Sequence, residues 1–221
     1  MIANNWVLIG VVFLTYFIVS WVYKRVDVTN LEKALPVRNG IRFLNLKHGL
    51  GIVLFGILFY VIFPSYRYLI CEFEIAKLEI LIPFFILTFL SAGISNMTAK
   101  GNLGDKIGFS NHSFSEAMVY FTIRFIFLLC YEFFFRGVLF FMFLDHFSLF
   151  IAITLSTILY FISHLFDSKK ELIRTIPFGV LLCILTYYTS SIWYAFIVHL
   201  ALSATYEISI FYYKTIKTFK S

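Results

Sequence analysis

Charged residues are scarce in this sequence. Asp, Glu, Lys and Arg make up 14% of its 221 residues and hydrophobic residues 61%, against about a quarter and about a half in soluble domains. A soluble core of this size cannot keep 29 Phe and 14 Tyr side chains from water, whereas a bilayer accepts apolar side chains on every outward face of a helix bundle. The composition excludes a water-soluble enzyme and predicts an all-α, polytopic membrane helix bundle.

Cysteines are also few. Cys71, Cys130 and Cys183 are odd in number, far apart and in or beside apolar runs, so they support neither a disulfide framework nor a thiolate metal site. Internal repeats and low-complexity tracts are absent. A basic leader with a small-residue cleavage site is absent too, so we expect the first apolar run to be a retained span. We interpret residues 1–221 as a single membrane domain.

Long apolar runs are abundant and predict about seven spans, since roughly 20 residues cross a hydrocarbon core of about 30 Å. The capping-box spacing Ser113-x-x-Glu116 predicts where the fourth span begins. The run from Thr175 to Tyr213 is too long for one crossing, so we expect it to break at residues 189–191. The other expected spans are Trp6 to Tyr23, Gly49 to Tyr66, Ile80 to Ile94, Ala117 to Leu144 and Phe147 to Phe166.

Basic residues alternate between the loops. Fourteen of the 18 Lys and Arg residues, Lys106, Lys217 and Lys220 among them, follow spans one, three, five and seven, and only Arg67 and Lys77 fall on the other side. The positive-inside rule then predicts an external N-terminus and a cytoplasmic C-terminus, in the plasma or inner membrane if the source is prokaryotic. The net charge of +6 is thus a topology signal, and nucleic acid is not an expected partner.

Two charged residues in the fourth span share one helix face. Charged side chains in a span cost about 2.5 to 3.5 kcal/mol each on insertion scales, so those present usually face the bundle interior and mark function. Glu132 and Arg136 are four residues apart, where a carboxylate can hold a guanidinium. For Arg124, on a different face, we expect the side chain to snorkel to the cytoplasmic interface.

Later spans carry two histidines at similar intervals. His164 follows Tyr160 by four residues, and His199 begins a stripe that continues through Ser203 and Glu207. Such groups can simply tie helices together, which is the alternative to a functional site. We expect His164 and His199 to converge with the charged pair of the fourth span on one polar cavity near the membrane midplane. Asp167 is a candidate partner of His164, although a solvated loop carboxylate is the favoured interpretation.

Three motifs resemble those of the CPBP family, which includes CAAX-type prenyl proteases and bacteriocin-processing or immunity proteins. YEFFFRG at residues 131–137 looks like its first motif, E-E-x-x-x-R-G. Tyr160-x-x-x-His164 resembles the second, F-x-x-x-H, and His199-x-x-x-Ser203 is similar to the third, H-x-x-x-N or D. The resemblance divides the chain into N-terminal spans over residues 1–112 and a core of four spans over residues 113–213.

The resemblance implies an intramembrane endopeptidase that cleaves a membrane-associated peptide or protein by attack of water. In the family the first Glu and the His of the second motif activate water, and the last motif stabilises the oxyanion. This mechanism requires no cofactor; the alternative is zinc held by His164, His199 and Glu132, although H-E-x-x-H is absent. The implied catalytic residues are Glu132, His164, His199 and Ser203, supported by Tyr131, Arg136, Tyr160 and Glu207.

The sequence departs from the family pattern at two positions. Tyr131 stands in place of the first Glu, and Ser203 in place of Asn. A phenol with a reference pKa near 10 is a poor general base at neutral pH, so we expect peptidase activity to be very weak or absent unless Glu132 or Glu207 supplies the carboxylate. Ser203 can still donate a hydrogen bond. The alternatives are an inactive relative that binds a membrane peptide or confers bacteriocin immunity, and a small transporter.

Overall fold

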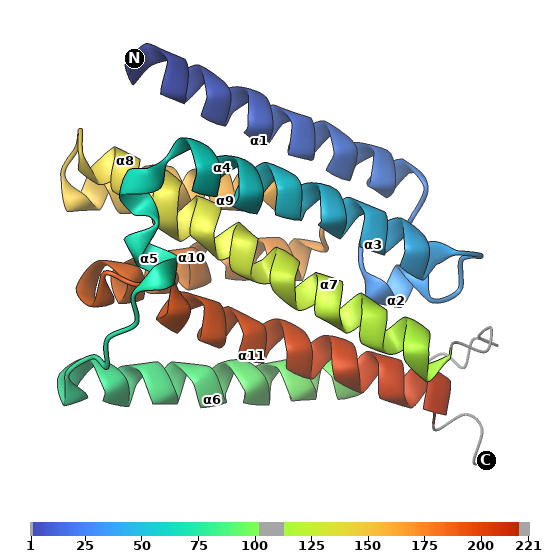
Figure 1. Cartoon of the computed structure of the whole chain (residues 1–221). Coiled ribbons are helices and arrows are strands. Elements are labelled where there is room, and N and C mark those ends of the chain that lie inside the picture. The colour runs from blue at the N-terminus through green and yellow to red at the C-terminus, as the bar shows by residue number, and fades with distance from the viewer. Residues whose placement is uncertain (1, 102–112, 217–221) are drawn as a thin grey trace.

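A computed structural model describes residues 2–101 and 113–216 as a helix bundle without strands in those ranges (Figure 1), so the predicted all-α membrane fold is confirmed. The basic residues Lys106, Lys217 and Lys220 lie outside the described residues. Six helices are long and apolar enough to cross a membrane, and α9 is a shorter apolar helix. The main helices are α1 (Ile2–Arg25), α3 (Gly40–Gly51), α4 (Leu58–Ile62), α6 (Leu78–Gly101), α7 (Phe114–Glu132), α8 (Phe140–Leu144), α9 (Leu149–Ser163), α10 (Lys169–Thr189) and α11 (Ile192–Phe211).

Short elements complete the bundle. Two π-helical segments, η1 and η3, join α3 to α4 and α7 to α8, and a third follows α11. Two short α-helices and a 3-10 turn lie in the connections between spans. These elements are η1 (Ile52–Ile57), η3 (Phe133–Leu139), η4 (Tyr212–Ile216), α2 (Leu31–Ala34), α5 (Tyr68–Cys71) and η2 (Pro64–Tyr66).

The second span begins earlier than the sequence suggested. Its helical stretch runs over Gly40–Ile62 and not from Gly49, because polar side chains in its first turns are accommodated by neighbouring rings. The Lys47 ammonium lies 5.8 Å from the ring centroids of both Tyr16 and Tyr23, within range of cation–π attraction. The fifth span is shorter than expected, since the 15 residues of α9 reach only about 22 Å.

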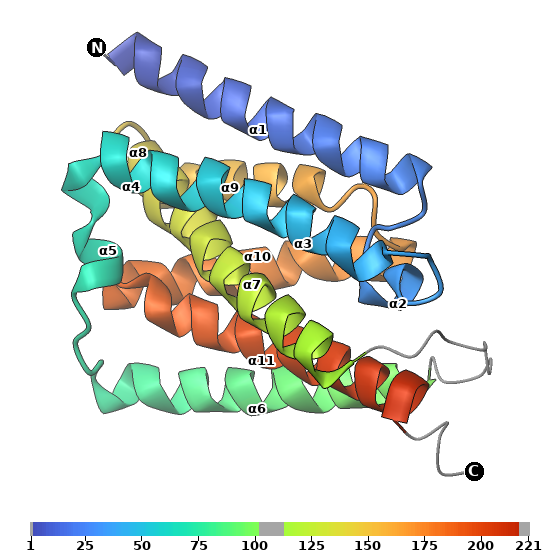
Figure 2. The ribbon, with the colours of Figure 1, turned by 45° about the vertical axis from the view of Figure 1, so that its right-hand side comes forward.

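The continuous stretch of α7, η3 and α8 forms the centre of the bundle. It crosses the molecule diagonally in both views (Figures 1 and 2), and 72% of its apolar stretch is buried, against 11% for α6 at the edge. Its start is fixed as predicted: Ser113 Oγ accepts from the Glu116 backbone N–H, and a Glu116 carboxylate oxygen accepts from the Ser113 N–H. The residues on this stretch are therefore the best placed for an interior site.

The long C-terminal apolar run divides where it was expected to. α10 ends at Thr189, Ser190 adopts a left-handed conformation with φ 48°, and the Ser191 hydroxyl accepts from the Trp193 backbone N–H to begin α11. The C-terminal end of α1, the first turn of α7 and the end of α11 lie at the same end of the bundle (Figures 1 and 2). Which side of the membrane this end faces stays a prediction.

Close helix contacts depend on glycine. A Cβ atom on Gly51 would lie 2.3 Å from the Phe127 ring, and one on Gly56 would lie 2.4 Å from Cys130 Sγ. Both partners are on α7. The second span thus approaches the central helix at two small residues, which is how helices commonly pack in membranes.

We expect Gly56→Ala to lower the free energy of unfolding by about 1 to 3 kcal/mol, the usual cost of overpacking a tight contact. Thermal unfolding in detergent measures this. Adding Cys130→Ala should recover part of the loss, because it removes the sulfur that the new methyl group meets. Gly49→Ala is the matched control, since nothing lies within 4 Å of the place its methyl group would take. Equal losses for the two alanine variants would contradict the contact.

Candidate active site

The first motif lies at the junction of α7 and the π-helical segment η3. Glu132 is the last residue of α7, and all residues of η3, including Arg136, are buried. A π-helical turn is wider than an α-turn and is often found at functional sites, because it changes the direction in which side chains project. No pattern in the amino-acid sequence indicated this local geometry.

Glu132, Arg136 and His199 are in direct contact inside the bundle. Arg136 Nη1 donates to Glu132 Oε1 at 3.3 Å, and His199 Nδ1 lies 2.5 Å from the same oxygen. Glu132 and Arg136 are both 0% exposed. Glu132 Oε2 and two guanidinium nitrogens of Arg136, Nε and Nη2, have no hydrogen-bond partner. A buried carboxylate oxygen without a partner can accept a hydrogen bond from a substrate or water.

A second chain of hydrogen bonds begins at Tyr131. Its hydroxyl oxygen lies 2.6 Å from Ser163 Oγ and 3.3 Å from His164 Nε2. His164 Nδ1 is 2.6 Å from Asp167 Oδ2, so Asp167 is a partner of His164, while its side chain, in the loop after α9, is also 30% exposed. Burial by itself would raise the pKa of Asp167, but the hydrogen bond to His164 and nearby positive charges hold that pKa below its ordinary value.

Tyr160 connects these two groups. The Arg136 guanidinium carbon lies 3.9 Å from the centroid of the Tyr160 ring, and the His164 ring lies 4.6 Å from it. The Tyr131 ring is also about equally far from the two histidines, at 6.1 Å from His164 and 6.2 Å from His199. Residues of all three sequence motifs therefore meet in one region, the third motif through His199 alone. His164 is joined to Glu132 through aromatic rings.

Glu207 belongs to a different cluster. Its carboxylate accepts hydrogen bonds from the Tyr120 hydroxyl and from Arg124 Nε, both at 2.9 Å. Arg124 does not snorkel to the interface as expected, because this largely buried carboxylate on α11 holds it. Glu207 is therefore engaged by residues of α7 other than those of the first motif, and it is not brought to the Glu132 cluster.

Ser203 lies one helical turn beyond His199 on α11, and within the described residues it makes no hydrogen bond to the cluster. The described part of the chain holds no group of three or more His, Cys, Asp or Glu side chains arranged to hold a metal ion. Sequence reasoning missed Ser163, which bonds to Tyr131; its position next to His164 was the available signal.

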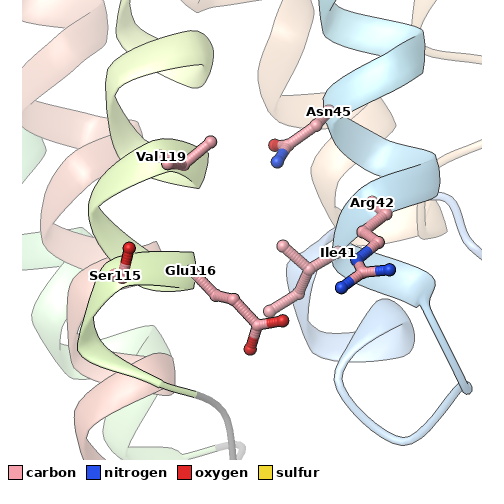
Figure 3. A pocket seen from close by; sticks show the side chains of 6 residues that line it. All are labelled: Ile41, Arg42, Asn45, Ser115, Glu116 and Val119. Carbon is pink, nitrogen blue, oxygen red and sulfur yellow. The ribbon is translucent and has the colours of Figure 1, made fainter.

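A separate pocket of about 160 Å³ lies between α3 and α7, near the first turn of α7 (Figure 3). Asn45 and Val119 face each other across it. Glu116 precedes Glu132 by 16 residues, about 24 Å of helix, so the pocket is distant from the cluster. None of its lining residues was predicted to be functional; they are Ile41, Arg42, Asn45, Ser115, Glu116 and Val119.

The fold and the cluster together define a multi-pass integral membrane protein with ionisable groups enclosed by its helices, an arrangement that marks function in membrane proteins. Residues 113–205 match the sequence model of a family described as type II CAAX prenyl endopeptidase Rce1-like. This match confirms the resemblance to the CPBP family and covers all three motifs. The sequence matches no curated protein and no solved structure.

Proposed function

We propose that this protein is an intramembrane endopeptidase that cleaves a membrane-associated peptide by attack of water, with Tyr131 keeping turnover slow. The observation that supports this most is the contact between Glu132 Oε1 and His199 Nδ1 at 2.5 Å, inside the segment that resembles the CAAX endopeptidases. A carboxylate that holds one imidazole nitrogen is the usual way to prepare a histidine as a general base.

The chemistry follows from the two nitrogens of His199. An ionised Glu132 accepts the Nδ1–H, which leaves the lone pair on Nε2 to take a proton from water. Arg136 holds the same carboxylate oxygen and favours its charged form. In this proposal His199 activates water, the role that the family gives to the first Glu of the first motif. The pair Glu132–His199 thereby replaces the missing carboxylate.

Slow turnover follows from the position of Tyr131. The phenol occupies the place beside His164 where the family has a carboxylate, and it is engaged by Ser163 and His164. General-base catalysis contributes a factor of about 10² to 10⁴, and a phenol supplies little of it near pH 7. The second candidate is an inactive relative that binds a membrane peptide, for example an immunity protein. The phenol of Tyr131 at the expected carboxylate position favours this candidate too.

Purified protein in lipid vesicles, incubated with prenylated and unprenylated membrane peptides, tests the proposal. We expect slow cleavage, detected by mass spectrometry, that falls by a factor of about 10² or more in His199→Ala, since the base is removed. Glu79→Gln, which removes an exposed carboxylate of α6, is the matched control and should cleave like the native chain. Cleavage that survives His199→Ala would refute the base; peptide binding without cleavage would support the inactive relative.

A further inference from the structure

The pocket between α3 and α7 contains a buried oxygen that lacks a hydrogen-bond donor. Asn45 extends from α3 toward Val119 on α7 (Figure 3), and its Oδ1 atom is buried without a hydrogen-bond partner in the described part of the chain. An amide oxygen can only accept, and a buried acceptor without a donor destabilises the fold. A molecule bound in this pocket would satisfy Asn45 by donating a hydrogen bond to it.

Opposite charges line the two walls of the pocket. The Arg42 guanidinium lies on the α3 wall, and the Glu116 carboxylate extends from α7 toward α3 (Figure 3). A ligand with a single charge of either sign would therefore be repelled by one wall. A ligand with a phosphate and an ammonium group matches both walls, because a guanidinium binds phosphate and an ammonium donates to carboxylate and amide oxygens.

The pocket lies at the end of two candidate membrane spans. Arg42 is the third residue of α3, which starts the span Gly40–Ile62, and Glu116 is the third residue of α7, which starts the span Phe114–Leu144. Polar headgroups of a bilayer lie at this depth, outside the hydrocarbon core of roughly 30 Å. The positive end of the α3 dipole also favours a phosphate near Arg42.

The size and the surroundings of the pocket restrict the ligand further. Its volume is about 160 Å³, below the roughly 300 to 1,000 Å³ of pockets that enclose drug-sized ligands, so it takes a small polar group and not a peptide. Val119 in its lining and Leu46 on α3 are 50% and 68% exposed. Exposed apolar side chains on a membrane span contact acyl chains. The chains of a lipid can thus lie along these residues while its headgroup occupies the pocket.

We infer that this pocket binds the headgroup of a phospholipid with a primary ammonium group, such as phosphatidylethanolamine. Arg42 binds the phosphate, and the ammonium donates hydrogen bonds to Asn45 Oδ1 and to the Glu116 carboxylate. Phosphatidylcholine carries the same two charges, but its quaternary ammonium has no N–H to donate and leaves Asn45 without a partner. The site is separate from the Glu132 cluster, and it does not depend on the proposed peptidase function.

Native mass spectrometry of the delipidated protein in detergent measures this selectivity, with dioleoyl lipids that differ only in the headgroup. We expect one phosphatidylethanolamine molecule to bind about tenfold or more tightly than phosphatidylcholine, the usual effect of a charge-assisted hydrogen bond. Equal binding of these two lipids would overturn the inference. Tighter binding of phosphatidylglycerol would also overturn it, because net charge would then select the lipid. Phosphoethanolamine without acyl chains should bind far more weakly; equal binding would make the ligand a soluble compound and refute a lipid site.

Two substitutions separate the two contacts. Asn45→Leu removes a buried acceptor that has no partner, so it should fold like the native chain, which thermal unfolding checks. It should abolish the preference for phosphatidylethanolamine and leave phosphatidylcholine binding unchanged. Arg42→Gln, at an exposed residue, should weaken both lipids by a similar factor, since both contain the phosphate. Arg38→Gln removes an exposed guanidinium outside the pocket and is the matched control, with no change expected. A preference that survives Asn45→Leu would refute this site.

Discussion

Replacing Tyr131 with Glu is expected to raise peptide cleavage by a factor of about 10² to 10⁴, the usual contribution of a well-placed general base. The substitution places a carboxylate next to His164, where the phenol oxygen now lies 3.3 Å from Nε2. Glu is smaller than Tyr, so it leaves room for water. A carboxylate can take a proton from water and later return it to the leaving amine, which a phenol cannot do near pH 7.

The rate of product formation in vesicles measures this effect. Tyr131→Gln is the matched control, since it makes the same space without a base, and His164→Ala added to Tyr131→Glu should remove the gain. A rise in Tyr131→Gln equal to that in Tyr131→Glu would mean that space, and not the carboxylate, limits the native chain. Robust native activity that survives both Glu132→Gln and Glu207→Gln would refute the idea that a missing carboxylate limits it.

The second large effect concerns the buried pair of Glu132 and Arg136. Glu132→Ala should lower the free energy of unfolding by about 3 to 5 kcal/mol, because it leaves a charged guanidinium in the interior without its counter-ion. The side chain of Arg136 is 1% exposed, and its guanidinium carbon lies 3.9 Å from the centroid of the Tyr160 ring, which cannot neutralise the charge. Unfolding in detergent followed by tryptophan fluorescence measures the loss.

A double-mutant cycle separates the pair from packing effects. Arg136→Met combined with Glu132→Ala should be markedly more stable than Glu132→Ala alone, since no uncompensated charge remains. Strictly additive losses would show that the two residues do not depend on each other. Arg38→Met, which removes an exposed guanidinium from the connection between α2 and α3, is the control and should change stability by less than about 0.5 kcal/mol.

The sequence predicted the parts of this protein that depend on local pattern. Apolar runs located the spans, the Ser113 and Glu116 spacing located the start of α7, and the interval between Glu132 and Arg136 placed them in contact. The start of the second span was predicted too late, because its first turns contain polar residues. Spacing along one helix does not reveal that one of them, Lys47, lies against rings of α1.

What the sequence could not provide is pairing between helices. Glu132 meets His199 across 67 residues, and Arg124 meets Glu207 across 83, so neither distance follows from a helical interval. The contact with His199 gives Glu132 a second partner besides Arg136. The contacts with Arg124 and Tyr120 hold Glu207 away from the candidate site. Asp167 was within reach of local reasoning, since it lies only three residues after His164.

The tight turn at Ser190 and Ser191 bears on how the chain is made. A link of two residues cannot extend across a bilayer or wait in water while one helix inserts alone, so α10 and α11 enter the membrane together as a helical hairpin. The apolar α10 offsets the insertion cost of the polar side chains on α11. His199 therefore reaches Glu132 only after the ribosome has completed the last hairpin, and every nascent chain released before that point lacks the cluster.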